Sequence, residues 1–224
     1  MRVVANYSTS LFDYINSDKN LKEVLSQGAD ESLLSEGAKK TLREKGISLN
    51  GSTTKDASVY ETVQETAESV RDSVIAFTGS DAESLFTTAE SSGSTAKIVT
   101  EVKSFVENYN AFASAVKEMG GSENTTYLEQ MNELLSKDSD AYEKIGITFA
   151  EDGTLTLDEK VLDGASVQDL MTAFYKDNDL EEIAQKSIRV QANAISGKYA
   201  ATVSNYTDSG TYSNSALSSF LKSI

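Results

Sequence analysis

The residues best suited to chemistry lie in a short acidic stretch that reads AEDGTLTLDE. An EF-hand calcium loop needs oxygen ligands at its positions 1, 3 and 5, glycine at 6 and glutamate at 12. Gly153 and Glu159 have the spacing of the glycine and the glutamate, and Asp152 falls at the fifth position. Thr148 and Ala150 then stand where two carboxylates are needed. We therefore expect no calcium site here.

Other catalytic groups are scarce in this chain of 224 residues. It has no His and no Cys, which removes Ser-His triads, thiolate chemistry and most zinc sites. Paired carboxylates can hydrolyse glycosides, and the adjacent pairs are Asp158-Glu159 and Glu181-Glu182. In so acidic a chain these pairs are expected to be solvated surface groups. We expect no enzyme, no cofactor and no bound metal, and keep a carboxylate hydrolase as a distant alternative.

The net charge limits the partners. A formal charge of −15 disfavours binding to nucleic acid or to anionic lipid. No apolar run approaches the roughly 20 residues that span a bilayer, so membrane insertion is not expected. The first residues, MRVVANYSTSLFDYIN, contain no apolar core of a signal peptide, so a cleaved secretory signal is not expected either.

The acidic stretch is better explained as a structural hairpin over residues 147–157. Apolar side chains alternate on either side of a turn formed by Ala150-Glu-Asp-Gly153, and glycine supplies the positive φ that such turns often need. The residues that define this hairpin are Ile147, Phe149, Asp152, Gly153, Leu155 and Leu157.

The strongest periodicity lies just before the hairpin, in KIVTEVKSFVENYNAFASAVKEMGG. Apolar residues spaced alternately by four and three predict a helix over 97–119 with an apolar seam about 33 Å long. The seam is Ile98, Val102, Phe105, Tyr109, Phe112, Val116 and Met119. Such a seam packs either within its own chain or against another subunit, and the pattern leaves both open.

Capping signals predict several further helices. Ser-x-x-Glu or Thr-x-x-Glu boxes beginning at Ser58, Ser80 and Thr126 are typical of helix starts, and Ser166 precedes another apolar pattern. A last long helix is expected over 180–205. Its weaker seam is Ile188, Ala192, Ile195 and Tyr199, with Gly197 inside it.

These elements predict a mainly α fold (α+β minor): an elongated antiparallel helical bundle with a small β-hairpin at 147–157. The expected organisation is an N-terminal segment of short helices and linker over 1–57, a bundle with the hairpin over 58–206, and a flexible tail with a terminal helix over 207–224.

Two strings, VTEVKSFVENYNAF and YEKIGITFAEDGTLTLDEKVLDGASVQDLMTAFY, together resemble the bacterial flagellar filament-capping protein family, also called hook-associated protein 2. The resemblance covers about residues 97–176. The matching positions are Phe105-Val106, Tyr109-Asn110, Gly146-Ile147, Asp152-Gly153-Thr154-Leu155, Leu157-Asp158-Glu159 and Phe174.

The resemblance implies a structural protein of the flagellar axis, exported unfolded without a cleaved signal peptide and located outside the cell on the flagellum. Its expected partners are further copies of itself, flagellin-like axial proteins or an export chaperone. Members of the family are usually longer ahead of this region, so a shortened paralogue or an accessory axial protein fits the chain as well. The alternative is a helical binding module or export chaperone that presents an exposed apolar face to a partner helix.

Overall fold

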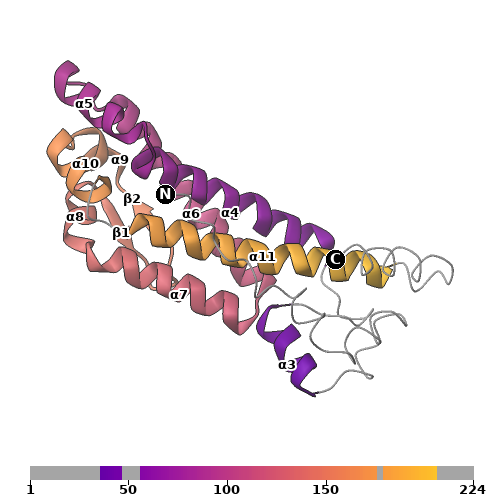
Figure 1. Ribbon diagram of the computed structural model, residues 1–224. Coiled ribbons are helices and arrows are strands. Elements are labelled where there is room, and N and C mark those ends of the chain that lie inside the picture. Colours follow the sequence, from indigo (N-terminus) through magenta and orange to yellow (C-terminus); the bar gives the residue numbers. More distant parts are fainter. Residues whose placement is uncertain (1–35, 47–55, 176–178, 206–224) are drawn as a thin grey trace. The chain divides into compact units, whose positions relative to one another are not determined.

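The computed structural model describes residues 36–46, 56–175 and 179–205. Within them the chain is mainly α-helical with one two-stranded antiparallel sheet, as the sequence predicts (Figure 1). The predictions for the tail over 207–224 and for most of the segment over 1–57 lie outside the described residues. In chain order the elements are α3 (Glu36–Glu44), α4 (Ala57–Thr78), α5 (Ala82–Ser92), α6 (Ala96–Met119), α7 (Ser122–Lys137), α8 (Ser139–Lys144), β1 (Ile147–Phe149), β2 (Leu155–Leu157), α9 (Glu159–Asp163), α10 (Val167–Phe174) and α11 (Leu180–Asn205).

The chain divides into two compact units. The first, here called the hairpin unit, comprises residues 65–117 and 126–188. The second, here called the polar unit, takes in the described residues among 1–64, 118–125 and 189–224. The division runs through α4, α6, α7 and α11. No helix among the described residues is long and apolar enough to cross a membrane.

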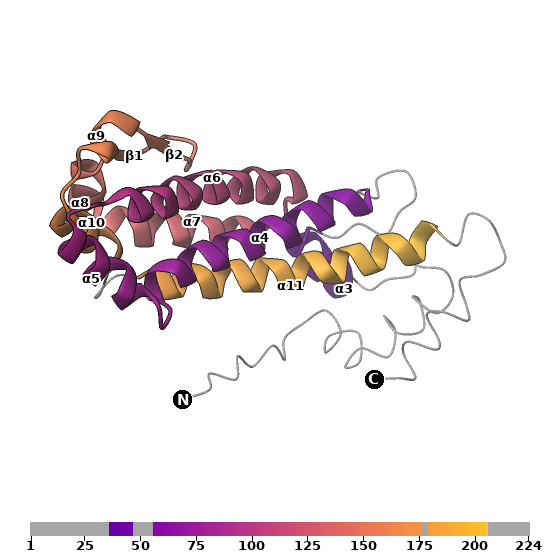
Figure 2. The same ribbon diagram turned by 90° about the horizontal axis from the view of Figure 1, so that it is seen from above.

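In the hairpin unit the long helices run side by side, with the short helices and the hairpin gathered at one end (Figures 1 and 2). That end is held by aromatic rings around Phe174 of α10. Its ring lies 4.4 Å from Phe77 and 5.5 Å from both Phe105 and Tyr142, measured between centroids. Aromatic pairs at such separations add about 0.5–1.5 kcal/mol each beyond the burial of their area. The cluster therefore joins α4, α6, α8 and α10.

Helix α6 buries the whole of its predicted seam. None of the seven residues from Ile98 to Met119 in that pattern exposes measurable surface. Burying a large apolar side chain is worth about 1.5–3 kcal/mol, so this face is a major source of stability. Because the chain's own residues cover it, the seam packs within its own chain, which is one of the two alternatives that the pattern left open.

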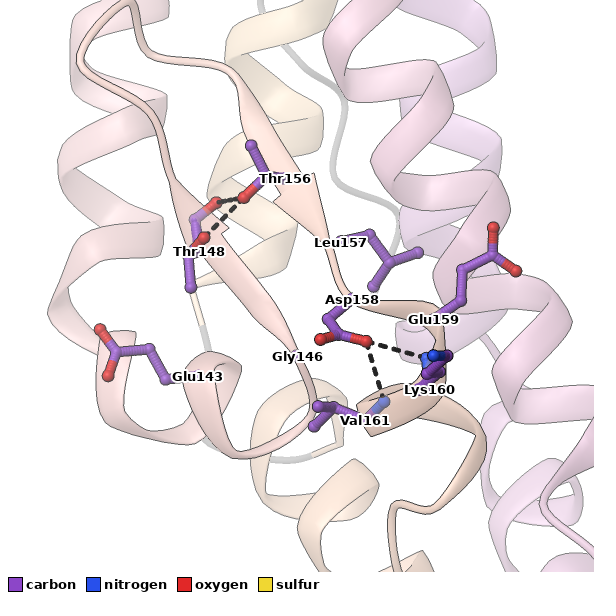
Figure 3. A pocket seen from close by; sticks show the side chains of 9 residues that line it. All are labelled: Glu143, Gly146, Thr148, Thr156, Leu157, Asp158, Glu159, Lys160 and Val161. Carbon is purple, nitrogen blue, oxygen red and sulfur yellow. Dashed lines mark hydrogen bonds between the residues drawn. The ribbon is translucent and has the colours of Figure 1, made fainter.

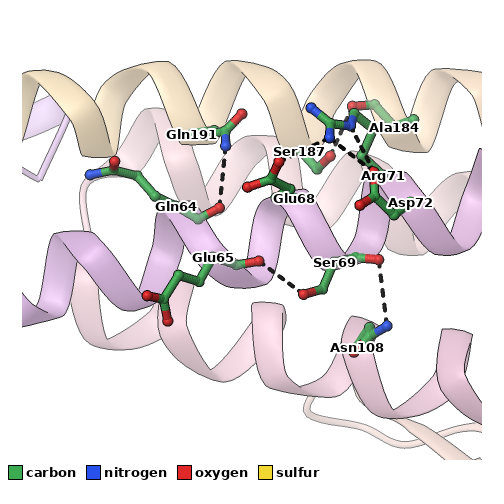
Figure 4. A network of polar contacts seen from close by, with 10 residues as sticks. All are labelled: Gln64, Glu65, Glu68, Ser69, Arg71, Asp72, Asn108, Ala184, Ser187 and Gln191. Atoms are coloured by element: carbon green, nitrogen blue, oxygen red, sulfur yellow. Dashed lines mark hydrogen bonds and ion pairs between the residues drawn. The ribbon is translucent and has the colours of Figure 1, made fainter.

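The polar edge of α6 has a different use. The Asn108 amide donates to Ser73 Oγ at 2.8 Å and to the Ser69 carbonyl at 3.4 Å, both on α4. Figure 4 shows the bond to Ser69. The Ser69 hydroxyl in turn donates to the Glu65 carbonyl one turn earlier. These bonds fix the register of α4 on α6, which apolar contacts alone specify weakly.

Several predicted helix starts are wrong by one to four residues. The side chain of Asp56, not that of Ser58, accepts the hydrogen bond that opens α4. Helix α5 begins after Asp81, which makes no side-chain cap bond, and Thr126 lies inside α7. The prediction holds for Ser166, whose hydroxyl accepts from the Asp169 N–H. A capping box is a local pattern, and neighbouring Asp residues compete for the same backbone donors.

The second predicted seam, on α11, is also wrong as a packing face. Ile195 is 46% exposed, Ile188 and Ala192 are half-buried, and the side chain of Tyr199 lies outside the described residues. The face that α11 buries instead mixes large apolar residues with small and polar ones: Leu180, Ile183, Ser187, Val190, Asn193, Ala194 and Ser196. Large apolar residues therefore lie on both faces of α11, and their spacing alone does not identify the buried face.

The polar unit is held by a buried hydrogen-bond cluster. Lys45 Nζ donates to Asn193 Oδ1 at 3.1 Å and to Glu123 Oε2 at 2.9 Å. The amide of Asn193 donates to Asn124 Oδ1 at 2.8 Å, and the Asn124 amide donates to the carbonyls of Lys45 and Gly120. Buried polar groups are costly unless they are hydrogen-bonded, so these contacts specify where the end of α3 lies.

Gly197 is required by its neighbour Tyr60 in the same unit. A Cβ atom added at Gly197 would overlap the ring of Tyr60, a fully buried side chain whose hydroxyl donates to the Gly46 carbonyl. The glycine inside the predicted seam therefore allows α11 to lie close to Tyr60 of α4.

We predict that Gly197→Ala destabilises the protein by about 1–3 kcal/mol, because overpacking Tyr60 costs more than the improved helix propensity returns. The matched control is Gly164→Ala, whose added Cβ meets its nearest atom at 3.5 Å and whose φ of −94° suits any residue. Urea unfolding followed by circular dichroism measures both. Equal stability of the two variants would contradict the close contact.

Candidate functional site

The candidate site is the β1–β2 hairpin together with the helices that hold it. The strands pair antiparallel in the register Ile147 with Leu157, Thr148 with Thr156, and Phe149 with Leu155. The Ala150 N–H donates to the Thr154 carbonyl and the Gly153 N–H to the Ala150 carbonyl, and Gly153 has a φ of +81°. The hairpin predicted from the sequence is confirmed.

The hairpin has an inner and an outer face. Ile147 and Leu155 are buried on the inner face, where Phe149 and Leu157 are half-buried. Thr148 and Thr156 are exposed on the outer face, with their hydroxyl oxygens 2.6 Å apart. An isolated two-stranded hairpin is marginally stable in water, so the inner face and the strand edges must be supported.

Asn110 of α6 provides that support at the outer edge of β2. Its Oδ1 accepts from the Leu155 N–H at 2.8 Å, and its Nδ2 donates to the Leu155 carbonyl at 2.7 Å. A side-chain amide carries the same donor and acceptor as a peptide group, so Asn110 acts as the missing third strand at this position.

A second amide lies below the turn. The Tyr109 hydroxyl donates to Asn132 Oδ1 at 2.6 Å, and burial raises the pKa of this phenol well above its usual range. A Cβ at Gly153 would meet the Asn132 amide nitrogen at 2.5 Å. Asn110 therefore contacts the hairpin directly. Tyr109 reaches it indirectly, through Asn132 of α7, which lies beside Gly153.

Two lysines of α6 hold the ends of the hairpin region. Lys117 Nζ donates to the Asp152 carbonyl at 2.6 Å and lies 3.3 Å from Asp152 Oδ2 in the turn. Lys103 lies 2.7 Å from Glu159 and 3.5 Å from Asp163, at the two ends of α9. Surface ion pairs are worth little individually, so their main effect is to orient α9 and the turn along α6.

Asp152 is the most perturbed carboxylate of the turn. Hydrogen bonds from the Thr154 hydroxyl at 2.6 Å and the Thr154 N–H at 3.1 Å, with a further contribution from Lys117, lower the pKa of Asp152 to about 2. Asp152 therefore has a structural role in the turn. Asp158 also has a structural role, because its Oδ1 accepts from the N–H groups of Lys160 and Val161 and caps α9.

Three of the carboxylates considered as catalytic or calcium-binding groups make structural contacts. Asp158 caps a helix, Glu159 pairs with Lys103, and Glu182 pairs with Lys186 at 3.0 Å. Among the described residues, no three acidic side chains gather closely enough to hold a metal ion.

An open groove of about 780 Å³ lies beside the outer face of the hairpin (Figure 3). Thr148 and Thr156 line it together with Glu143 of α8, and with Lys160 and Val161 of α9. Val161 is 40% exposed, which makes it one of three large apolar side chains so exposed among the described residues. The groove was not found from the sequence, because its residues are ordinary types that only the hairpin brings together.

Comparisons of the chain with family models, with curated proteins and with solved structures return no match.

We predict that Asn110→Ala lowers the free energy of unfolding by about 1–3 kcal/mol, because it leaves the Leu155 N–H and carbonyl without partners. The matched control is Asn110→Asp, which still accepts from the Leu155 N–H but cannot donate to the carbonyl. Amide hydrogen exchange measures this directly. The Leu155 amide should lose protection in the alanine variant and keep part of it in the aspartate variant; unchanged exchange in both would show that the hairpin does not depend on Asn110.

A second prediction concerns acid. Since the folded pKa of Asp152 lies below the value of about 3.9 for an unfolded Asp, its contribution to turn stability is complete above about pH 4. That contribution is lost as the pH falls through about 2. Titration of the Asp152 carboxyl carbon by NMR should show this low midpoint, and Thr154→Val should raise it. A midpoint near 4 in the unsubstituted protein would show that the Thr154 bonds do not persist in solution.

Proposed function

We propose that this chain is a non-enzymatic structural protein of the bacterial flagellum or cell surface, similar to the flagellar filament cap, and that it self-assembles. The proposal includes export without a cleaved signal peptide and a location outside the cell. Partners would be further copies of the chain or flagellin-like axial proteins, with an export chaperone before assembly.

The observation that carries the proposal is the bidentate contact between Asn110 and Leu155. The resemblance rests on two separate strings, and this contact joins a residue of the first to a residue of the second. Phe105 of the first string also packs edge-on against Phe174, the next-to-last residue of the second, at 5.5 Å. The matching positions thus belong to one folded unit, which makes the likeness more specific than two short strings would be.

The use made of the acidic groups supports the same proposal. The carboxylates best placed for chemistry cap a helix, close a turn or pair with lysine. Their contacts stabilise the hairpin and the helix α9 that follows it. A surface that is built in this way suits a protein that is recognised by shape and charge.

The α6 seam is buried, so assembly has to use another surface. The half-exposed stripe of Ile188, Ala192 and Ile195 on α11 favours the alternative of a binding module or export chaperone with an apolar face. That alternative expects a one-to-one complex with a partner helix and no oligomer of the chain itself.

The test is immunogold electron microscopy of the native cells with antibody against the recombinant chain. The expected result is label at filament tips or along filaments, and label at tips alone would favour the capping role. The control is a strain in which the gene is deleted. Label that remains in the cytoplasm would contradict export, and would favour the chaperone alternative.

A further inference from the structure

The groove beside the hairpin carries two opposite charges on opposite sides of an apolar centre. Glu143 of α8 and Lys160 of α9 lie on either side of Val161, with Thr148 and Thr156 along the strands beside it (Figure 3). Glu143, Lys160, Thr148 and Thr156 are all exposed. The groove is thus an exposed surface with an apolar floor rather than a closed cavity.

Glu143 and Lys160 differ from the other charged residues that line the groove, Asp158 and Glu159. Asp158 caps α9, Glu159 and Asp163 pair with Lys103, and Asp152 pairs with Lys117. Neither Glu143 nor Lys160 has an ion-pair partner among the described residues. One free anion and one free cation therefore face the solvent across the same groove.

We propose that this groove is a self-association surface that binds the same groove of a second copy. The proposal rests on the self-assembling function proposed above and names the surface through which two copies would pair; a two-fold contact closes on itself, so any larger assembly would use a further surface. A two-fold axis through the groove places Glu143 of each protomer opposite Lys160 of its partner. The dimer then contains two equivalent Glu143–Lys160 pairs. The same rotation brings the Val161 side chains and the threonine methyl groups of the two copies together at the centre.

The contact is small, and this sets its strength. Interfaces below about 1,200 Å² are typical of transient complexes, so a single groove pair gives a weak dimer. Two chains of charge −15 also repel each other at long range, and salt screens this repulsion beyond about 8 Å at 0.15 M. The dimer is therefore expected at physiological salt and high protein concentration.

Charge reversal tests the two-fold arrangement. Glu143→Lys places Lys opposite Lys at both pairs, and Lys160→Glu places Glu opposite Glu. Each single variant should dimerise at least about tenfold more weakly than the unsubstituted protein. An equimolar mixture of the two variants pairs every Lys with a Glu, so it should regain the dimer. The double variant, which carries both substitutions in one chain, should regain it by itself.

Sedimentation velocity over a range of concentrations in 0.15 M salt is the measurement. The matched controls are Lys144→Glu, next to Glu143 but outside the groove lining, and Glu90→Lys on α5, both at exposed positions. Neither should change the dissociation constant beyond the effect of net charge. Far-UV circular dichroism checks that the single variants are folded, and recovery in the mixture and in the double variant requires that they are.

Two results would overturn the proposal. A protein that stays monomeric at every concentration has no such surface. Association that neither single variant weakens, or that the mixture does not restore, uses a different surface. In the second case self-assembly survives while the groove is excluded. The cellular location of the chain, measured separately, tests the proposed function in either case.

Discussion

The contact on which the hairpin unit most depends is the pair of hydrogen bonds between Asn110 and Leu155. Strands of three residues have too few ladder bonds to be stable alone, and an open strand edge leaves peptide groups without partners. Asn110 removes both problems at β2 with one side chain. Since Asn110 follows Tyr109, whose ring is buried in the α6 seam, the position of the hairpin is set directly by the position of the core.

Each of the two units is stabilised internally by a different kind of contact. In the hairpin unit, aromatic rings around Phe174 supply burial, and polar bonds from Asn108 and Asn110 set the register. In the polar unit, hydrogen bonds from the amides of Asn124 and Asn193 and from the ammonium of Lys45 position the end of α3. Apolar contacts are non-directional, whereas hydrogen bonds demand particular atoms at particular distances. The second kind of contact therefore tolerates fewer alternative arrangements.

The excess of acidic residues gives the few cations a positioning role. Lys103 and Lys117 of α6, Lys45 after α3 and Lys186 of α11 each contact a carboxylate. At exposed sites such pairs add little stability, and salt weakens them further. The pairs made by Lys103, Lys117 and Lys45 join short elements or turns to longer helices, whereas Lys186 pairs within α11. A protein organised in this way has a surface whose shape is well defined although its charge is strongly negative.

The sequence by itself determined the elements that depend on local or periodic patterns. The α6 seam, the hairpin around Gly153 and the Ser166 cap were all predicted, because turn chemistry and helical spacing act within a few residues. Only the tertiary structure decided the rest. The buried face of α11 follows from close approach between helices, with Gly197 against Tyr60, and not from the size of its apolar residues. The Lys45 cluster joins residues up to 148 positions apart. The groove exists only where the folded hairpin meets α8 and α9. Each depends on which side chains meet across separate elements, and no local pattern contains that information.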